Sequence, residues 1–229
     1  MGEFDESRLK SKELFTNPEG GIAYGFVASY EFPWEALPHI KEYIRELGKS
    51  LSESEYDRVG EEIWISREAT VAPSASISGP CIIMPGAEVR QCAFIRGSAL
   101  VGRGCVVGNS TELKNCILFD RVQVPHFNYV GDSILGYKAH LGAGVITSNV
   151  KCDKTPVSVR YEGGRIFTDL TKMGAIVGDG CEVGCNTVLN PGTVLGRGVI
   201  VYPLSSVRGY VEAGERYKGV ESGKWKVES

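Results

Sequence analysis

The sequence is poor in histidine, in net charge and in long apolar runs. It has three histidines and a formal net charge of −3. The small net charge argues against nucleic-acid or membrane partners held by basic charge, and no apolar run approaches the roughly 18–20 residues of a membrane span. The charged first segment, MGEFDESRLKSKELF, has no apolar stretch typical of a secretory signal. We therefore expect a cytoplasmic protein with neither nucleic acid nor membrane as a partner.

The sequence also lacks a CxxC pair. Its seven cysteines are an odd number, and without a secretory signal this favours free thiols over disulfides. The closest pair, Cys181 and Cys185, has a poor spacing for a zinc knuckle. We expect no structural metal site.

A hydrophobic period of six residues dominates the chain from residue 67 to residue 210. The first run of aliphatic positions is Val71, Ile77, Ile83, Val89, Ile95, Val101, Val107 and Leu113. The residue two positions earlier is small in each of these repeats. The phase slips by one residue after Leu113 and again later, and a second clean run extends from Val177 to Val207. A period of six has no helical component and predicts short strands joined by corners, three to a coil. The fold class is therefore mainly β.

The repeat predicts how the coil interior is filled. The aliphatic side chains point inward and the small residues fit near the corners. Many of the 29 glycines follow an aliphatic residue, where a turn favours residues that tolerate positive φ. Four cysteines occupy the small interior position and are expected to be core residues: Cys81, Cys105, Cys116 and Cys181.

Three segments do not follow the period. Residues 1–66 are predicted to be an α/β arm, with a helix over 34–51 and one or two strands within 21–32. Residues 150–174 interrupt the coils, and VSVRYEGGRIFTDL predicts a hairpin around Gly163. Residues 211–229 form a polar tail that we expect to be extended or partly disordered.

Polar residues of successive coils predict an anion site. Arg96 and Lys114 are 18 residues apart, so they should stack in neighbouring coils, where two like charges favour an anion such as phosphate. Glu112 lies close enough along the same face to orient a base. His126 follows Lys114 by twelve residues, a spacing that reaches the same edge once the phase slip is included. The alternatives are a turn histidine on a scaffold and solvated charges on a coil face.

The segment GNSTELKNCILFDRVQVPHFNYVGDSILGYKAHLGAGVITSN, residues 108–149, resembles the hexapeptide-repeat acyltransferase family. It is similar to glucosamine-1-phosphate acetyltransferase domains of bifunctional UDP-N-acetylglucosamine enzymes and to carboxy-terminal domains of archaeal sugar-1-phosphate nucleotidylyltransferases. The resemblance covers roughly residues 70 to 210, and its most specific parts are PHxxYxGD and GAGxITxN. It implies a left-handed parallel β-helix, a homotrimer, and transfer of acetyl from acetyl-CoA to an amino-sugar 1-phosphate without a metal.

The resemblance also implies roles for individual residues. His126 matches the general base that takes a proton from the sugar amine, and Glu112 matches an acidic position near it. Arg96 and Lys114 match the residues that hold the sugar phosphate. Imidazole suits this base because its pKa lies near 7.

Further positions match the substrate and coenzyme contacts of the family. Tyr129 and Asn149 match substrate-contacting residues, although an aromatic lining a groove is the alternative for Tyr129. Lys172, at the end of the excursion, loosely matches a further substrate lysine. The backbone of Ala143 matches the group that faces the acetyl thioester.

The chain departs from the family pattern at four positions. His140 stands where an Asn near the reacting centre is usual, and Val150 follows Asn149 where Tyr is common. In the coenzyme region, Cys185 replaces Ser and Pro203 replaces Ala. These departures bear on the identity of the substrate and donor more than on the base.

Two absences limit the function further. The chain has no glycine-rich nucleotide loop, and residues 1–66 leave no room for a Rossmann-like domain, so we do not expect this chain alone to make UDP-sugars. A separate nucleotidylyltransferase is a candidate partner for that step. Some β-helices of this kind hold zinc with three histidines, but here only His126 and His140 lie in the coils. The alternatives to acetyl transfer are a non-catalytic trimeric module that binds sugar phosphate or a partner, and a transferase for another acyl group or sugar.

Overall fold

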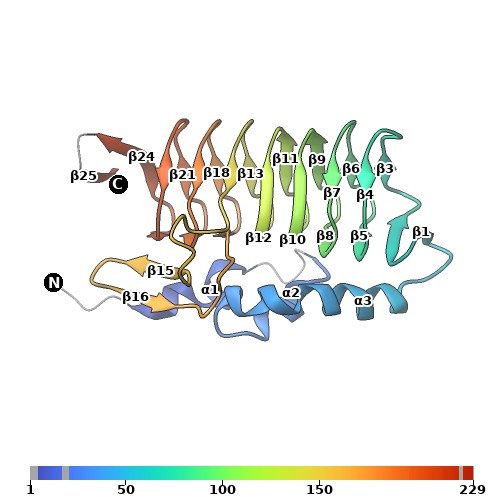
Figure 1. Cartoon of the computed structure of the whole chain (residues 1–229), viewed down its shortest axis with the longest axis horizontal. Coiled ribbons are helices and arrows are strands. Elements are labelled where there is room, and N and C mark those ends of the chain that lie inside the picture. Colours follow the sequence, from blue (N-terminus) through green and yellow to red (C-terminus); the bar gives the residue numbers. More distant parts are fainter. Residues whose placement is uncertain (1–4, 17–20, 222–223, 229) are drawn as a thin grey trace.

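The protein is a parallel β-solenoid with a helical arm along one side (Figure 1). The structure is a computed structural model, which describes residues 5–16, 21–221 and 224–228. Parallel strands pair from coil to coil, so that Cys81 lies opposite Ala99 and Ile83 opposite Val101. This confirms the mainly β, coiled architecture that the period of six predicts.

Each coil contributes short strands to three faces. The first face consists of β3 (Thr70–Val71), β6 (Glu88–Val89), β9 (Val106–Asn109), β11 (Gln123–His126), β13 (His140–Leu141), β18 (Glu182–Val183), β21 (Ile200–Val201) and β24 (Arg216–Glu221). The second face consists of β4 (Ser76–Ile77), β7 (Phe94–Ile95), the first parts of β10 (Glu112–Leu118) and β12 (Tyr129–Leu135), β14 (Ile146–Thr147), β19 (Val188–Leu189) and β22 (Ser206–Val207). The third face consists of β2 (Ile63–Ser66), β5 (Cys81–Ile83), β8 (Ala99–Val101), the second parts of β10 and β12, β17 (Ala175–Val177), β20 (Thr193–Leu195) and β23 (Tyr210–Val211).

Two of the bends between these faces recur below. We call the bend from the first to the second face the first corner, and the bend from the second to the third face the second corner. β10 and β12 run through the second corner, with Asn115 and Asp132 at the bend in left-handed conformations, at φ of 48° and 46°. Asn and Asp adopt this conformation more readily than other non-glycine residues, which suits them to the bend.

The interior of the coil is the aliphatic series that the repeat predicts. The side chains of Val101, Leu118 and Leu135 stack in register and are fully buried. The four cysteines assigned to the interior are also buried. Burial disfavours their thiolate form and raises the pKa of Cys81, for example, to about 12.

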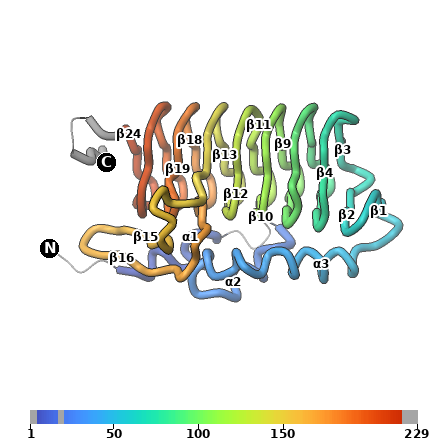
Figure 2. Tube along the Cα trace, viewed as in Figure 1, coloured from blue at the N-terminus to red at the C-terminus, as the bar shows by residue number. Residues whose placement is uncertain are grey.

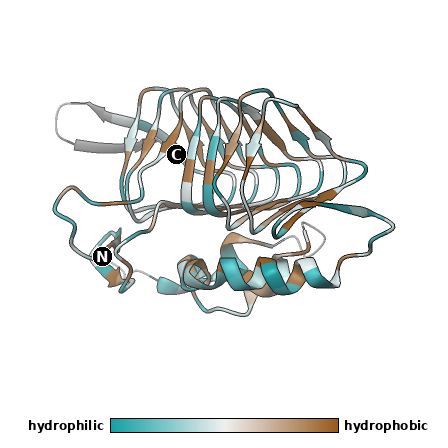
Figure 3. Ribbon diagram, turned by 45° about the vertical axis from the view of Figure 1, so that its right-hand side comes forward, coloured by the Kyte–Doolittle hydropathy of each residue, from teal (hydrophilic) through white to brown (hydrophobic). Residues whose placement is uncertain are grey.

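The arm covers the third face. It comprises η1 (Glu6–Leu9), α1 (Ser11–Leu14), α2 (Tyr24–Ala28), η2 (Pro33–His39), α3 (Ile40–Ser50) and the antiparallel strand β1 (Tyr56–Gly60). The outward residues of the third-face strands are apolar and buried beneath it, including Ile82, Leu100 and Ile117. Because these strands are covered on both sides, they carry runs of apolar residues instead of an alternating pattern. In Figure 3 the helices lie directly beneath the coils, with hydrophilic residues on the outer side of α3.

The excursion is a hairpin that projects from the solenoid beside the arm (Figure 2). Its strands β15 (Ser158–Tyr161) and β16 (Gly164–Phe167) pair antiparallel around Glu162 and Gly163. The sheet continues across the interruption, since β12 pairs directly with β17. Within the described residues, no helix is long and apolar enough to cross a membrane.

Several boundaries differ from the sequence prediction. Residues 24–28 form a short helix where strands were expected, because Ala23 and Val27, one helical turn apart, are both buried in the core of the arm. The helix expected over 34–51 begins as a 3-10 helix and becomes α-helical only at Ile40.

The limits of the solenoid also differ. Its sheet begins at Ile63, which pairs with Cys81, and not at residue 67. The segment from residue 211 is extended where it is described, and it belongs to the sheet, because β24 pairs with β21 and β25 (Lys224–Glu228) pairs with β24. Residues 222–223 and 229 of that segment lie outside the described residues.

Candidate active site

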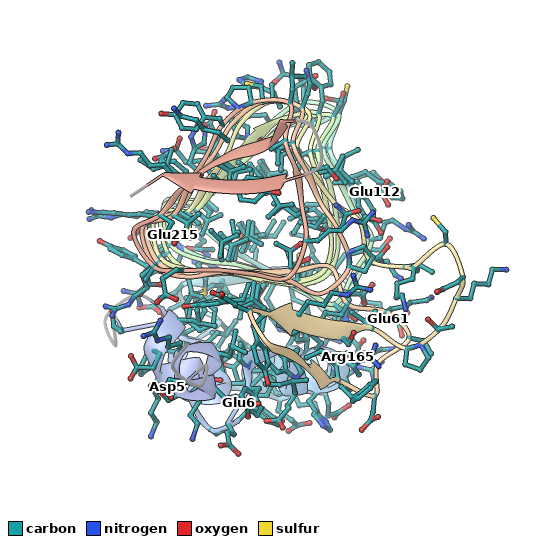
Figure 4. All side chains as sticks on the ribbon, turned by 90° about the vertical axis from the view of Figure 1, so that its left-hand side faces the viewer. Asp5, Glu6, Glu61, Glu112, Arg165 and Glu215 are labelled. Atoms are coloured by element: carbon teal, nitrogen blue, oxygen red, sulfur yellow. The ribbon has the colours of Figure 1, made fainter. Side chains whose placement is uncertain are left out.

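The strand register brings four predicted residues onto adjacent coils. His126 lies opposite Asn109 on β9, while Glu112 lies opposite Tyr129 and Lys114 lies opposite Gly131. Neighbouring strands are about 4.8 Å apart, so these side chains share one stretch of surface. His126 stands at the first corner and the others on the second face, which borders it. In Figure 4, which looks along the axis of the coils, Glu112 points outward from the solenoid.

The turn that carries His126 is held by a buried asparagine. Asn128 is 2% exposed, its side-chain oxygen accepts the N–H of His126 at 3.1 Å, and its Nδ2 donates to the carbonyl of Gly142 at 2.8 Å. Phe127 between them is left-handed, at φ 53°. The His126 side chain is exposed, and among the described residues it has no hydrogen-bond partner. A neutral imidazole in this position has a free nitrogen lone pair that can accept a proton.

Glu112 contacts a cation, although the sequence predicts that it orients the base. Its Oε1 lies 2.7 Å from Nη1 of Arg96, and both side chains are partly exposed, at 32% and 45%. The N–H of Arg96 donates to the carbonyl of Leu113, so Arg96 lies one coil before Lys114, as its spacing predicts. Lys114 has no acidic partner among the described residues. Exposed ion pairs are weak, so an anionic ligand can compete with Glu112 for Arg96.

The ring of Tyr129 lies along its own strand. A Cβ placed on Gly131 would be 2.5 Å from the Tyr129 hydroxyl oxygen and 2.7 Å from Cζ, so the absence of a side chain at Gly131 makes room for the ring. The hydroxyl oxygen accepts a hydrogen bond from Nδ2 of Asn149 at 3.3 Å. Burial raises the pKa of Tyr129, and the negative charges of Asp132 and Glu112 add to this effect. The phenol is therefore protonated at neutral pH.

Three polar side chains stack at the second corner and form what we call the Asn–Asp–Asn ladder. Asn115, Asp132 and Asn149 follow one another at intervals of 17 residues. The carboxylate of Asp132 accepts a hydrogen bond from Nδ2 of Asn115 at 2.8 Å and one from Nδ2 of Asn149. Sequence reasoning assigned no role to Asn115 or to Asp132, although Asp132 is the last residue of the PHxxYxGD motif. The repeated 17-residue spacing of Asn and Asp is the signal that points to them.

The excursion begins and ends beside this ladder. It leaves the coil after Asn149, and on its return the N–H of Met173 donates to the carbonyl of Asn149 at 3.0 Å. Lys172 is exposed, and it directly precedes Met173 at the point where the excursion returns to the coil. Val150, the residue after Asn149, is 40% exposed.

The predicted coenzyme residues form a column at the first corner. The N–H of Asn186 donates to the carbonyl of Ala143, and the N–H of Leu204 donates to the carbonyl of Cys185. The column continues from His126, whose carbonyl accepts the N–H of Gly144 at 3.0 Å. Ala143, Cys185 and Pro203 therefore follow His126 along one edge in successive coils.

His140 lies on the first face, away from the second face that holds Glu112 and Tyr129. Its Nδ1 is 2.8 Å from Oε2 of Glu182, and its strand neighbour in the preceding coil is Gln123. Gln123 precedes His126 by three residues, or about 10 Å along a strand. Within the described residues, no group of three His, Cys, Asp or Glu side chains could hold a metal ion.

The chain is similar in sequence to a family of known proteins. Residues 77–162 match the family model described as the GMPPB C-terminal domain. Over 109 residues the chain is 36% identical to the bifunctional protein GlmU of Methanococcus maripaludis strain C5, covering 48% of this chain and 26% of that protein. The solenoid is similar to hexapeptide-repeat acetyltransferases. This confirms the family resemblance that the sequence motifs predict.

Two further relatives support the same family. The chain is 30% identical over 126 residues to the bifunctional sugar-1-phosphate nucleotidylyltransferase/acetyltransferase of Sulfurisphaera tokodaii, covering 55% of this chain and 31% of that protein. It is 31% identical over 139 residues to the putative acetyltransferase YaiX of Escherichia coli, covering 61% and 60%. The chain thus spans less than two thirds of each of these relatives. Among solved structures, the acetyltransferase domain of PglB from Neisseria gonorrhoeae is 17% identical with a TM-score of 0.32, covering 69% of this chain and 55% of that one.

Proposed function

We propose that the protein is an acetyl-CoA-dependent N-acetyltransferase that acts on an amino-sugar 1-phosphate. The observation that carries the proposal is the His126 side chain, which has no hydrogen-bond partner in the described part of the chain and lies at the edge of a face that also bears Tyr129, Arg96 and Lys114. One edge thus offers a base, a phenol and two cations. The similarity to sugar acetyltransferases suggests acetyl transfer to a sugar amine as the reaction that these groups carry out.

His126 acts as the general base. A protonated amine cannot attack a thioester, so the imidazole removes a proton from the sugar amine as its nitrogen bonds to the thioester carbonyl carbon. The carbon–sulfur bond then breaks, and the coenzyme A thiolate leaves and takes up a proton. The backbone N–H of Ala143 donates to no acceptor among the described residues and is available to stabilise the oxyanion.

Arg96 and Lys114 hold the phosphate. Phosphate binding exchanges the exposed Arg96–Glu112 ion pair for a bidentate hydrogen-bonded contact with the guanidinium group, while Lys114 adds a point charge. Released from Arg96, Glu112 becomes free to act on the base, as the family resemblance implies. Lys172 approaches the sugar from the returning excursion.

Coenzyme A lies along the column of Ala143, Cys185 and Pro203, in the groove between neighbouring solenoids of a homotrimer. The exposed apolar side chains of Phe127 and Leu204 border that column and fit such a groove.

The test is an assay of acetyl transfer from acetyl-CoA to a panel of amino-sugar 1-phosphates. The released coenzyme A thiol is measured as the readout. Glucosamine 1-phosphate should be turned over, and His126→Ala should abolish turnover while leaving sugar-phosphate binding intact. No turnover by the wild-type protein over the whole panel would refute the proposal.

A second candidate is a non-catalytic module that binds sugar phosphate. The pairing of Glu112 with Arg96 favours it, since Glu112 has no contact with His126 among the described residues. Calorimetry with each ligand separates the two candidates: sugar-phosphate binding without coenzyme A affinity supports the module, and clear coenzyme A affinity counts against it.

A further inference from the structure

We propose that Asp132 is a positioning residue which, through Asn149, directs the Tyr129 hydroxyl to donate a hydrogen bond to the bound substrate. The inference rests on the proposed function for its catalytic consequence. It gives a role to the Asn–Asp–Asn ladder, since the proposed function assigns none to Asn115 or Asp132.

The chemistry of a carboxylate decides how the ladder is oriented. Asp132 is 6% exposed, and its two oxygens face the side-chain amides of Asn115 and Asn149. An ionised carboxylate only accepts hydrogen bonds, so each amide must turn its NH2 group toward Asp132. The orientation of the Asn149 amide is therefore set by the charge beside it.

This orientation determines what Tyr129 can do. Nδ2 of Asn149 donates both to Asp132 and to the Tyr129 hydroxyl oxygen. Toward the ladder, the hydroxyl oxygen is therefore an acceptor. The Tyr129 O–H has no acceptor among the described residues. Because the ring lies over Gly131, the strand partner of Lys114, the O–H is available on the surface where the phosphate is held.

The ladder is anchored at both ends. At one end, Nδ2 of Asn115 also contacts the carbonyl of Leu37 in η2 at 3.3 Å, which ties the ladder to the arm. At the other end, the carbonyl of Asn149 accepts the N–H of Met173, where the excursion returns. Asp132 lies between these attachments and is itself largely shielded from water, so its oxygens have few alternative partners.

The decisive variant is Asp132→Asn. Asn115 and Asn149 donate to different oxygens of Asp132, and an Asn side chain would replace one of these two oxygens with an NH2 group, which donates and does not accept. The Asn149 amide then turns its oxygen toward the new NH2 group, and Tyr129 donates to Asn149 instead of to the substrate. We expect kcat to fall by about tenfold to hundredfold, the scale for a lost or misplaced transition-state donor, with the KM for acetyl-CoA unchanged.

Asp179→Asn is the matched control. Asp179 is also a corner carboxylate that joins the solenoid to the arm, since it accepts the backbone N–H groups of Tyr137 at 2.8 Å and Thr16 at 2.9 Å. It lies at the bend from the third to the first face, between β17 and β18, whereas Tyr129 begins β12 on the second face and Asn149 follows β14 on that face. Both variants should lower the unfolding temperature, and only Asp132→Asn should lower kcat. Equal effects of the two variants on kcat would overturn the inference.

A double-mutant cycle with Tyr129→Phe tests the route of the effect. If Asp132 acts through the Tyr129 hydroxyl, Asp132→Asn has little further effect on kcat once that hydroxyl is removed. An undiminished effect of Asp132→Asn in the Tyr129→Phe protein would show that Asp132 acts by another route, and it would overturn the inference.

Fluorine NMR tests the positioning without turnover. With 3-fluorotyrosine at position 129, Asp132→Asn should shift the fluorine resonance and lower the pKa of the phenol, because a negative charge beside it is removed. Asp179→Asn should leave both unchanged. An unchanged resonance in the Asp132→Asn protein overturns the inference, whereas absence of turnover by the wild-type protein refutes only the proposed function.

Discussion

A methyl group added at Gly131 should displace Tyr129 and reduce acetyl transfer. The Cβ of Gly131→Ala would lie 2.5 Å from the Tyr129 hydroxyl oxygen, whereas ordinary contact begins near 3.4 Å, so the ring must move by about 0.9 Å (3.4 − 2.5) or rotate outward. The hydrogen bond from Asn149 is already 3.3 Å long, and a movement of this size breaks it.

The expected magnitudes follow from that broken contact. Loss of one hydrogen bond costs about 0.5–1.5 kcal/mol, which lowers the unfolding temperature by about 1–6 °C for a chain of this size. Misplacement of a substrate-contacting group by about 1 Å lowers kcat by up to about a hundredfold. Thermal unfolding and initial rates of acetyl transfer measure the two effects.

Gly25→Ala serves as the control for the glycine substitution. It lies in α2, and a Cβ there would meet nothing within 4 Å. Because alanine favours a helix over glycine by about 1 kcal/mol, this variant should be slightly stabilised and fully active. Wild-type kcat in the Gly131→Ala protein would refute the placement of Tyr129 against the substrate.

Other predictions concern the ion pair, the arm and one buried phenol. Glu112→Gln should tighten sugar-phosphate binding in calorimetry by about two- to fivefold, because the competing partner of Arg96 is removed; weaker binding would contradict this role. Ile117→Ala, beneath the arm, should cost about 2–5 kcal/mol in denaturant unfolding, whereas Ile146→Ala on the exposed second face should change stability by at most about 0.5 kcal/mol. Burial raises the pKa of Tyr43 from 10.0 to about 12, so the free energy of unfolding should fall as pH rises between these values. Tyr43→Phe should make that fall shallower, and an identical pH profile in the variant would contradict the raised pKa.

The period of six residues was sufficient to predict the solenoid and its interior. An aliphatic residue every sixth position, with a small residue two places earlier, can be buried only if the chain turns repeatedly at the same spacing. The hairpin around Gly163 was predictable for a similar reason, because alternating residues flank a local turn signal. The hairpin depends on contacts between residues that are near in sequence. The solenoid depends on one type of contact that is repeated from coil to coil.

The arm and the partner of Glu112 were not predictable in this way. The third-face strands carry apolar residues on both sides, such as Ile82 beside Ile83, but only docking of the arm shows what covers them. Glu112 was expected beside His126 because both lie near one edge. Its distance to Arg96 depends on how side chains extend between coils, which spacing along the sequence does not specify.

By itself, the sequence determined the coiled fold, the burial of the aliphatic series and the resemblance of the solenoid to hexapeptide-repeat acyltransferases. Each follows from a periodic pattern or a local motif. Only the tertiary structure decided which polar groups meet at the second corner. The phase slips shorten these coils to 17 residues, and the stacking of Asn115, Asp132 and Asn149 exists only once each coil closes on the one before. The closure then turns the Asn149 amide toward Tyr129.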